Sequence, residues 1–99
     1  MDILTGSVPF GKDRGTGPRT GTADVDFGRN LTNVWAVLTG MDFGFSPRDD
    51  HHLGLVDIKV DAAALGNIAR VTATLGVRDW SDNWDDNYEG TVYFAVLAE

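Results

Sequence analysis

Apolar and polar residues alternate along most of this chain with the two-residue period of a β-strand. The alternation is cleanest in the last three segments, where every second side chain is apolar. One earlier segment instead has a continuous apolar run, Val34-Trp-Ala-Val-Leu38, which is typical of a strand buried on both faces. The pattern predicts six strands, at residues 3–10, 23–27, 33–41, 53–61, 68–77 and 91–98.

Turn-forming residues separate most of these segments, at Gly28, Gly40, Pro47, Gly66 and Gly90. A longer loop, rich in glycine and proline, is expected from Gly11 to Thr22. The only helical alternative is the alanine-rich segment Asp61 to Leu65, which is too short to form a helix alone. We therefore predict an all-β fold, a six-stranded antiparallel β-sandwich, as a single domain over residues 1–99.

The third and sixth predicted strands carry apolar side chains on both faces. In the sixth, Tyr93 and Leu97 lie opposite the expected core residues, and Trp35 and Val37 do so in the third. Such faces are usually covered by something. We expect the cover to be another copy of the chain, which predicts a homo-oligomer; shielding of one sheet by the 11–22 loop is the alternative.

Composition excludes several classes of partner and chemistry. The chain has 8 basic and 15 acidic residues and a net charge of −7, which argues against nucleic acid and anionic membranes. Without cysteine it forms neither disulfides nor thiolate zinc sites. No segment approaches transmembrane length, and no signal peptide is visible, which leaves the cytoplasm or export by a non-classical route.

An aromatic and acidic stretch near the C-terminus carries the candidate chemistry. The sequence Asp79-Trp-Ser-Asp-Asn-Trp-Asp-Asp-Asn-Tyr-Glu-Gly90 places three aromatic rings among acids and amides. A ring stacks on the C–H face of a sugar while carboxylates accept its hydroxyls. The stretch predicts a carbohydrate site, and its alternative is an acidic surface loop whose rings fold back onto the core. The candidate residues are Asp79, Trp80, Asp82, Trp84 and Tyr88.

The same stretch is compatible with calcium, because oxygen-bearing residues recur at every second position. These residues are Asp79, Ser81, Asn83 and Asp85. The EF-hand pattern fails, however, since tryptophan and glycine occupy its required glycine and glutamate positions. The pair His51-His52 offers imidazoles for a divalent metal, but adjacent strand residues point to opposite faces. A solvated loop and a solvated turn are therefore the favoured interpretations, with no required cofactor.

The order of the strands resembles the H-type lectin domain of snail agglutinins and discoidin-like proteins. The resemblance begins with Ile3-Leu-Thr-Gly-Ser-Val8 and the polar loop after it, and continues with Val25-Asp-Phe27 and the run from Val34 to Leu38. The alternating strand at 56–60 and the final pair, 71–77 and 92–98, complete it. It covers nearly the whole chain and rests on strand lengths and order.

This resemblance implies a symmetric trimer, or a hexamer of paired trimers, that binds galactose- or N-acetylgalactosamine-type sugars between subunits. Carried over to this chain, the site residues of the family fall on Asp13, with Arg14 beside it, on His52 where snail members have arginine, and on the segment from Asp79 to Tyr88. We thus expect a multivalent carbohydrate-binding module. The alternative is a structural domain whose role is trimerisation.

No catalytic motif of known spacing is present in the sequence. Paired carboxylates serve glycoside hydrolysis in other proteins, but a domain of 99 residues leaves little room for a deep cleft. We therefore expect that the protein is not an enzyme.

Overall fold

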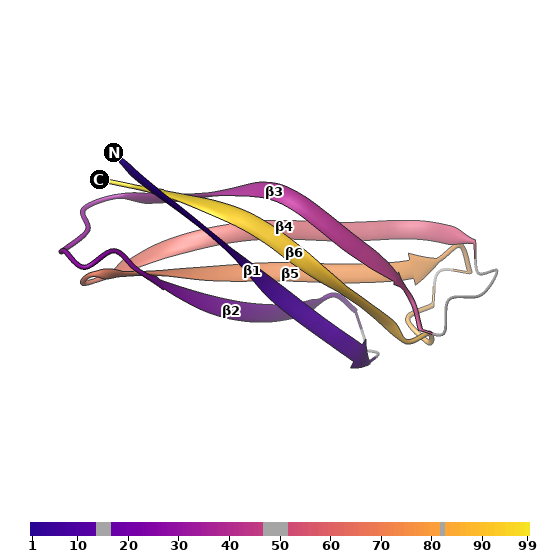
Figure 1. Ribbon diagram of the computed structural model, residues 1–99. Helices are drawn as coiled ribbons and strands as arrows, with labels where there is room; N and C mark the ends of the chain where they lie inside the picture. Colours follow the sequence, from indigo (N-terminus) through magenta and orange to yellow (C-terminus); the bar gives the residue numbers. More distant parts are fainter. Residues whose placement is uncertain (14–16, 47–51, 82) are drawn as a thin grey trace.

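The computed structural model describes residues 1–13, 17–46, 52–81 and 83–99. It has six antiparallel strands in two three-stranded sheets packed as a sandwich (Figure 1), which confirms the predicted fold class. Sheet A has the order β1-β6-β3 and sheet B the order β2-β5-β4. The strands are β1 (Asp2–Asp13), β2 (Arg19–Asp26), β3 (Val34–Phe45), β4 (Leu53–Leu65), β5 (Ile68–Asp79) and β6 (Tyr88–Ala98).

The central strands β5 and β6 supply most of the core, as their alternation predicts. The inward residues of both strands are at most 2% exposed: Val71, Ala73, Leu75, Val77, Val92, Phe94, Val96 and Ala98. Each of these strands has a neighbour on both sides in its own sheet. Their outward residues follow the opposite parity, so the two-residue period correctly separates core from surface.

The strands are longer than the sequence pattern predicts. β1 continues to Asp13, opposite Tyr88 of β6, and β2 begins at Arg19, opposite Leu75 of β5. The predicted loop at 11–22 is therefore too long, because backbone pairing extends both strands through residues that carry no apolar signal. The segment from Asp61 to Leu65 is also strand, paired with β5 up to the turn at Gly66, whose φ is +64°.

The sandwich is elongated, with extents of 47 × 20 × 18 Å. Both termini lie at one end, where Arg29 Nη2 contacts Asp2 Oδ2 at 2.9 Å and the Glu99 amide donates to the Asn33 carbonyl at 3.0 Å. Strands β1, β3 and β5 end at the opposite end (Figure 1), which we call the loop end. The part of the chain that the structure describes holds no helix able to span a membrane.

The outer faces of the two sheets differ in chemistry. On sheet B the face is polar, and Arg70 Nε donates to Asp24 Oδ1 at 2.9 Å. This hydrogen bond and the charge of Arg70 lower the pKa of Asp24, although so exposed a pair adds little to stability. On sheet A, Trp35, Val37 and Tyr93 are 44–47% exposed. The described residues of the 11–22 segment do not shield them, because that segment continues β1 and β2 toward the loop end.

Candidate functional site

Most of the predicted sugar-binding residues meet at the loop end. Asp13 ends β1, Asp79 ends β5, and the Trp80 amide donates to the His52 carbonyl at 3.0 Å. Trp84 follows in the connection between β5 and β6, and Tyr88 begins β6. These strand ends place the described candidate residues at one end of the sandwich. Arg14, His51 and Asp82 lie outside the described residues.

Trp80 is the most exposed large apolar side chain among the described residues. Its side chain is 76% exposed, and the His52 ring meets it edge-on, with centroids 6.2 Å apart and planes at 76°. Among the described residues, these two line a shallow hollow of about 320 Å³. An exposed indole with a polar ring at its edge provides an apolar surface and a hydrogen-bonding group side by side.

Gly54 sets the close approach of the chain segments that carry His52 and Trp80. A Cβ atom at position 54 would lie 2.5 Å from the Asp79 carbonyl oxygen and 2.7 Å from the Trp80 Cα. Both are backbone atoms, so they cannot yield by rotation of a side chain. Sequence analysis missed this glycine, although it falls at the start of a predicted strand, where a glycine often marks close backbone contact.

We expect the Gly54→Ala substitution to separate the Trp80 and His52 rings and to lower stability by about 1–3 kcal/mol, as overpacking usually does. Two-dimensional NMR would report changes in the His52 ring and Trp80 indole signals, with the core signals of β6 unchanged. Gly11→Ala is the matched control, because a Cβ there meets nothing within 4 Å. Unchanged ring signals in Gly54→Ala would contradict this role.

Trp84 is a half-buried residue at the edge of the core. A Cβ added to Gly76 would lie 3.0 Å from the tip of its ring, so Trp84 packs over that glycine. The guanidinium of Arg78 lies 5.7 Å from the Trp84 ring centroid, within cation–π distance. Arg78, which sequence analysis did not select, precedes Trp80 by two residues and adds hydrogen-bond donors to this end of β5. Trp84 thus supports the site more than it presents a free face.

Tyr88 is a core residue, which corrects its prediction as a sugar contact. Its side chain is 0% exposed, and its hydroxyl lies within donating distance of the Leu75 carbonyl, at 3.2 Å, and of the Gly17 carbonyl, at 3.0 Å. The Arg19 guanidinium covers the ring at 4.4 Å and donates to the Tyr88 carbonyl at 2.7 Å. Tyr88 therefore packs in the core at the loop end and cannot contact a ligand in this conformation.

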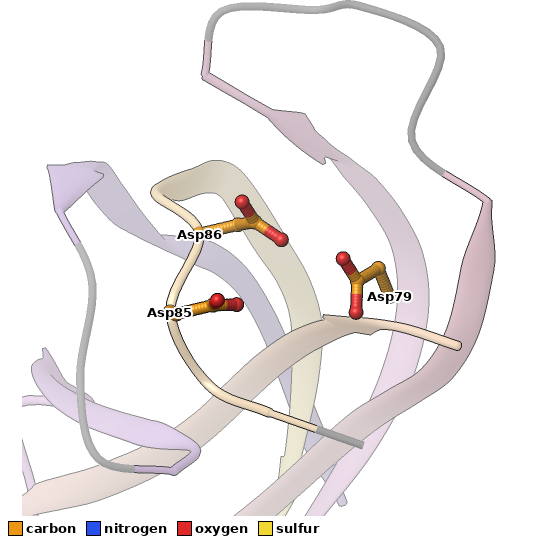
Figure 2. A group of neighbouring side chains, drawn as sticks. All are labelled: Asp79, Asp85 and Asp86. Atoms are coloured by element: carbon orange, nitrogen blue, oxygen red, sulfur yellow. The ribbon is translucent and has the colours of Figure 1, made fainter. Parts of the chain in front are cut away.

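Three carboxylates gather where the end of β5 meets the connection to β6 (Figure 2). The ligand atoms of Asp79, Asp85 and Asp86 all lie within 4.8 Å of one another. Asp79 and Asp85 belong to the alternating set expected from the sequence, whereas Asp86 does not. Ser81, also of that set, is bonded to Asp79: its amide donates to Asp79 Oδ1 at 3.0 Å, and its hydroxyl donates to the same oxygen. Carboxylate oxygens so placed suit a hard cation such as Ca²⁺.

Comparisons with protein-family models, with curated proteins and with solved structures find no match to this chain. The resemblance to the H-type lectin domain therefore stays a prediction.

Proposed function

We propose that this protein is a carbohydrate-binding module that takes a sugar at the loop end, with Trp80 as its stacking surface. The observation that carries the proposal is the 76% exposure of Trp80 beside the edge of His52. An indole exposed to water makes few apolar contacts within the protein, and a pyranose supplies a C–H face of matching size. The close approach of Gly54 to the backbone of Asp79 and Trp80 places Trp80 beside His52.

Polar groups around the Trp80 ring suit the hydroxyls of a neutral sugar. The nitrogens of His52 donate or accept, and the carboxylate of Asp79, the residue before Trp80, accepts from hydroxyl groups. The chain carries a net charge of −7, which disfavours sialylated or sulfated glycans through like-charge repulsion. Galactose- or N-acetylgalactosamine-type sugars, which the resemblance implies, are neutral and fit this setting.

The test is a glycan array of neutral and anionic glycans, followed by titration of the best neutral ligand. Loss of the stacking surface in Trp80→Ala is expected to weaken binding at least about fivefold, since such contacts contribute about 1 kcal/mol. Asp79→Ala and Trp84→Ala test the polar and supporting groups. Leu65→Ala is the matched control, because Leu65 is 47% exposed and lies at the turn between β4 and β5, at the other end of the sandwich.

Two outcomes count against this site. Binding that survives Trp80→Ala, Asp79→Ala and Trp84→Ala with unchanged affinity would place the sugar elsewhere on the protein. Binding to no glycan at all, with the chain folded and assembled, would favour the assembly-domain alternative, for which the exposed apolar residues of sheet A are the supporting observation.

Calcium binding at the aspartate cluster is tested separately, by thermal unfolding. If the carboxylates of Asp79, Asp85 and Asp86 hold Ca²⁺, added CaCl₂ raises the melting temperature and EDTA reverses the rise, because a ligand that binds only the folded state stabilises it. Asp85→Asn, at an exposed member of the cluster, should weaken that response. Equal melting with CaCl₂ and EDTA would reject a calcium site.

A further inference from the structure

We infer that the sugar stacked on Trp80 is one unit of a longer neutral glycan, whose further units lie along the outer face of sheet B. This rests on the proposed function, because Trp80 remains the stacking surface. Three properties of the molecule support it: the side of the sheet on which Trp80 lies, the polar side chains that continue from it, and the balance of charge among them.

Trp80 lies at the end of the outer face of sheet B. The outward residues of β5 alternate with its buried core residues and are exposed or half-buried: Arg70, Thr72, Thr74 and Arg78. Trp80 follows Arg78 by two positions, and its amide continues the strand pairing by donating to the His52 carbonyl at 3.0 Å. A ligand stacked on the Trp80 ring therefore meets this face of the sheet with its next unit.

Polar side chains continue from β5 onto both neighbouring strands. Residues paired across a sheet have their side chains on the same face, so each outward residue of β5 lies in a row with residues of β2 and β4. Three such rows, which we call the polar rows, are Thr20 with Thr74 and Lys59, Thr22 with Thr72 and Asp61, and Asp24 with Arg70 and Ala63. Threonine hydroxyls donate and accept, lysine and arginine donate, and aspartate accepts. The polar rows therefore offer sugar hydroxyls partners of both kinds across the width of the sheet.

Charge on this face suits an uncharged ligand. From Trp80 to Arg70, the outward side chains of sheet B include three basic and three acidic groups: Lys59, Arg70, Arg78, Asp24, Asp57 and Asp61. Arg70 Nε donates to Asp24 Oδ1 at 2.9 Å, and Lys59 Nζ lies 3.4 Å from Asp57 Oδ1. The face is thus locally balanced, although the chain carries a charge of −7. Anionic strands and basic peptides gain no net attraction here, whereas sugar hydroxyls bond to charged groups of either sign.

Two hollows lie on this face of sheet B. One is the hollow of about 320 Å³ beside Trp80 and His52, and the other, of about 130 Å³, is lined by Asp61, Ala62, Ala63, Arg70 and Thr72. Thr72 comes eight positions before Trp80, which corresponds to roughly 27 Å along an antiparallel strand. That separation exceeds the size of a single sugar unit, so a monosaccharide occupies one hollow and a chain reaches both.

The face between the two hollows is partly apolar. Gly76 of β5 lies there, and the Pro18 and Trp84 side chains pack over it, each 3.0 Å from the place of an added Cβ. The proline ring and the indole suit the C–H faces of sugar units, while the polar rows beyond them suit the hydroxyls. The path from Trp80 to Thr72 therefore offers both kinds of contact that a glycan chain makes.

The test is calorimetric titration of the intact protein with galactose and with a linear β-linked galactose hexasaccharide. We expect the hexasaccharide to bind at least about thirtyfold more tightly: its six equivalent units account for about sixfold, and added hydrogen bonds account for the rest. Two-dimensional NMR should show amide shifts at Thr22 and Thr72 with the hexasaccharide and not with galactose. A gain of about sixfold or less would overturn the inference and leave the proposed function standing. Binding of neither sugar would overturn the proposed function in its galactose form, and the inference with it.

Thr22→Val and Thr72→Val, combined in one protein, remove two hydroxyls of the polar rows and keep side chains that favour strands. Affinity for the hexasaccharide should fall at least about fivefold, whereas affinity for galactose stays that of the parent, because the hollow beside Trp80 is unchanged. Thr5→Val, at an exposed position of edge strand β1 in sheet A, is the matched control and should bind both sugars as the parent does. Circular dichroism should show the parent fold in both proteins. Hexasaccharide binding that the double substitution leaves unchanged would place the chain off this face and overturn the inference.

Discussion

Replacing Gly90 by alanine is expected to destabilise the sandwich by about 3 kcal/mol, at the upper end of overpacking effects. A Cβ at this position of β6 would lie 2.1 Å from the Asp42 carbonyl oxygen and 2.9 Å from the Phe43 Cα. These are backbone atoms of β3, which is paired with β6 along its length. The two strands must therefore move apart, and that movement breaks hydrogen bonds on both sides of the new methyl group.

Denaturant unfolding followed by tryptophan fluorescence would measure this loss. Gly11→Ala is the matched control, because alanine in a strand is better tolerated than glycine and nothing lies within 4 Å of its Cβ. The control should be neutral or slightly stabilising. A midpoint for Gly90→Ala equal to that of the parent would mean that β3 and β6 are held less closely in solution than the structure shows.

The sequence predicted the core well because the alternation in β5 and β6 is long and regular. Strand ends were predicted poorly, and for one physical reason: glycine, threonine and aspartate residues give no apolar signal where pairing alone extends a strand. Arg19 to Thr22 continue β2 in this way, paired with β5. Ala62 to Ala64 favour helix by propensity, but a segment so short gains nothing as a helix and gains backbone partners on β5 as a strand.

The location of the described candidate residues at one end of the sandwich follows from the order of the strands, since they lie at strand ends or in the connections next to them. A position at this end of the sandwich does not determine whether a side chain points into the core or outward. The alternation along the strand does. Tyr88 has the parity of Val92 and Phe94, which point inward, and it is buried with them. Trp80 has the parity of Thr72 and Arg78, which point outward from β5. Extending the alternation past the predicted strand ends would have separated the two rings.

The aspartate cluster was predicted only in part from the sequence. Asp79 belongs to the end of β5, whereas Asp85 and Asp86 belong to the connection that folds back beside it (Figure 2). Their approach depends on the path of that connection, which follows from how Trp84 packs over Gly76. The regular spacing included Asp79 and Asp85 but not Asp86, which the fold of this connection brings beside them.

The exposed apolar residues of sheet A and the proposed sugar site lie in opposite halves of an elongated molecule, and this separation has a measurable consequence. Ile3, Trp35 and Val37 lie in the half of sheet A that carries the termini, while Trp80 and His52 lie at the loop end. Association through the outer face of sheet A therefore leaves the proposed sugar sites open. A single shallow site binds weakly, because a monosaccharide offers few atoms and its hydroxyls must lose water. Several sites on one oligomer gain avidity without any new contact with the sugar.

We expect Val37→Asp to reduce binding to a densely glycosylated surface by about 10²–10⁴-fold, the usual range of avidity, and to leave the affinity for free monosaccharide unchanged. Trp80→Ala should weaken both, because it removes the stacking contact itself. Surface plasmon resonance on dense and sparse glycan layers, with titration of the free sugar, separates the two effects. If Val37→Asp binds the dense layer as the parent does, the sugar sites act singly. The outer face of sheet A then plays no part in carbohydrate recognition, even if it assembles the protein.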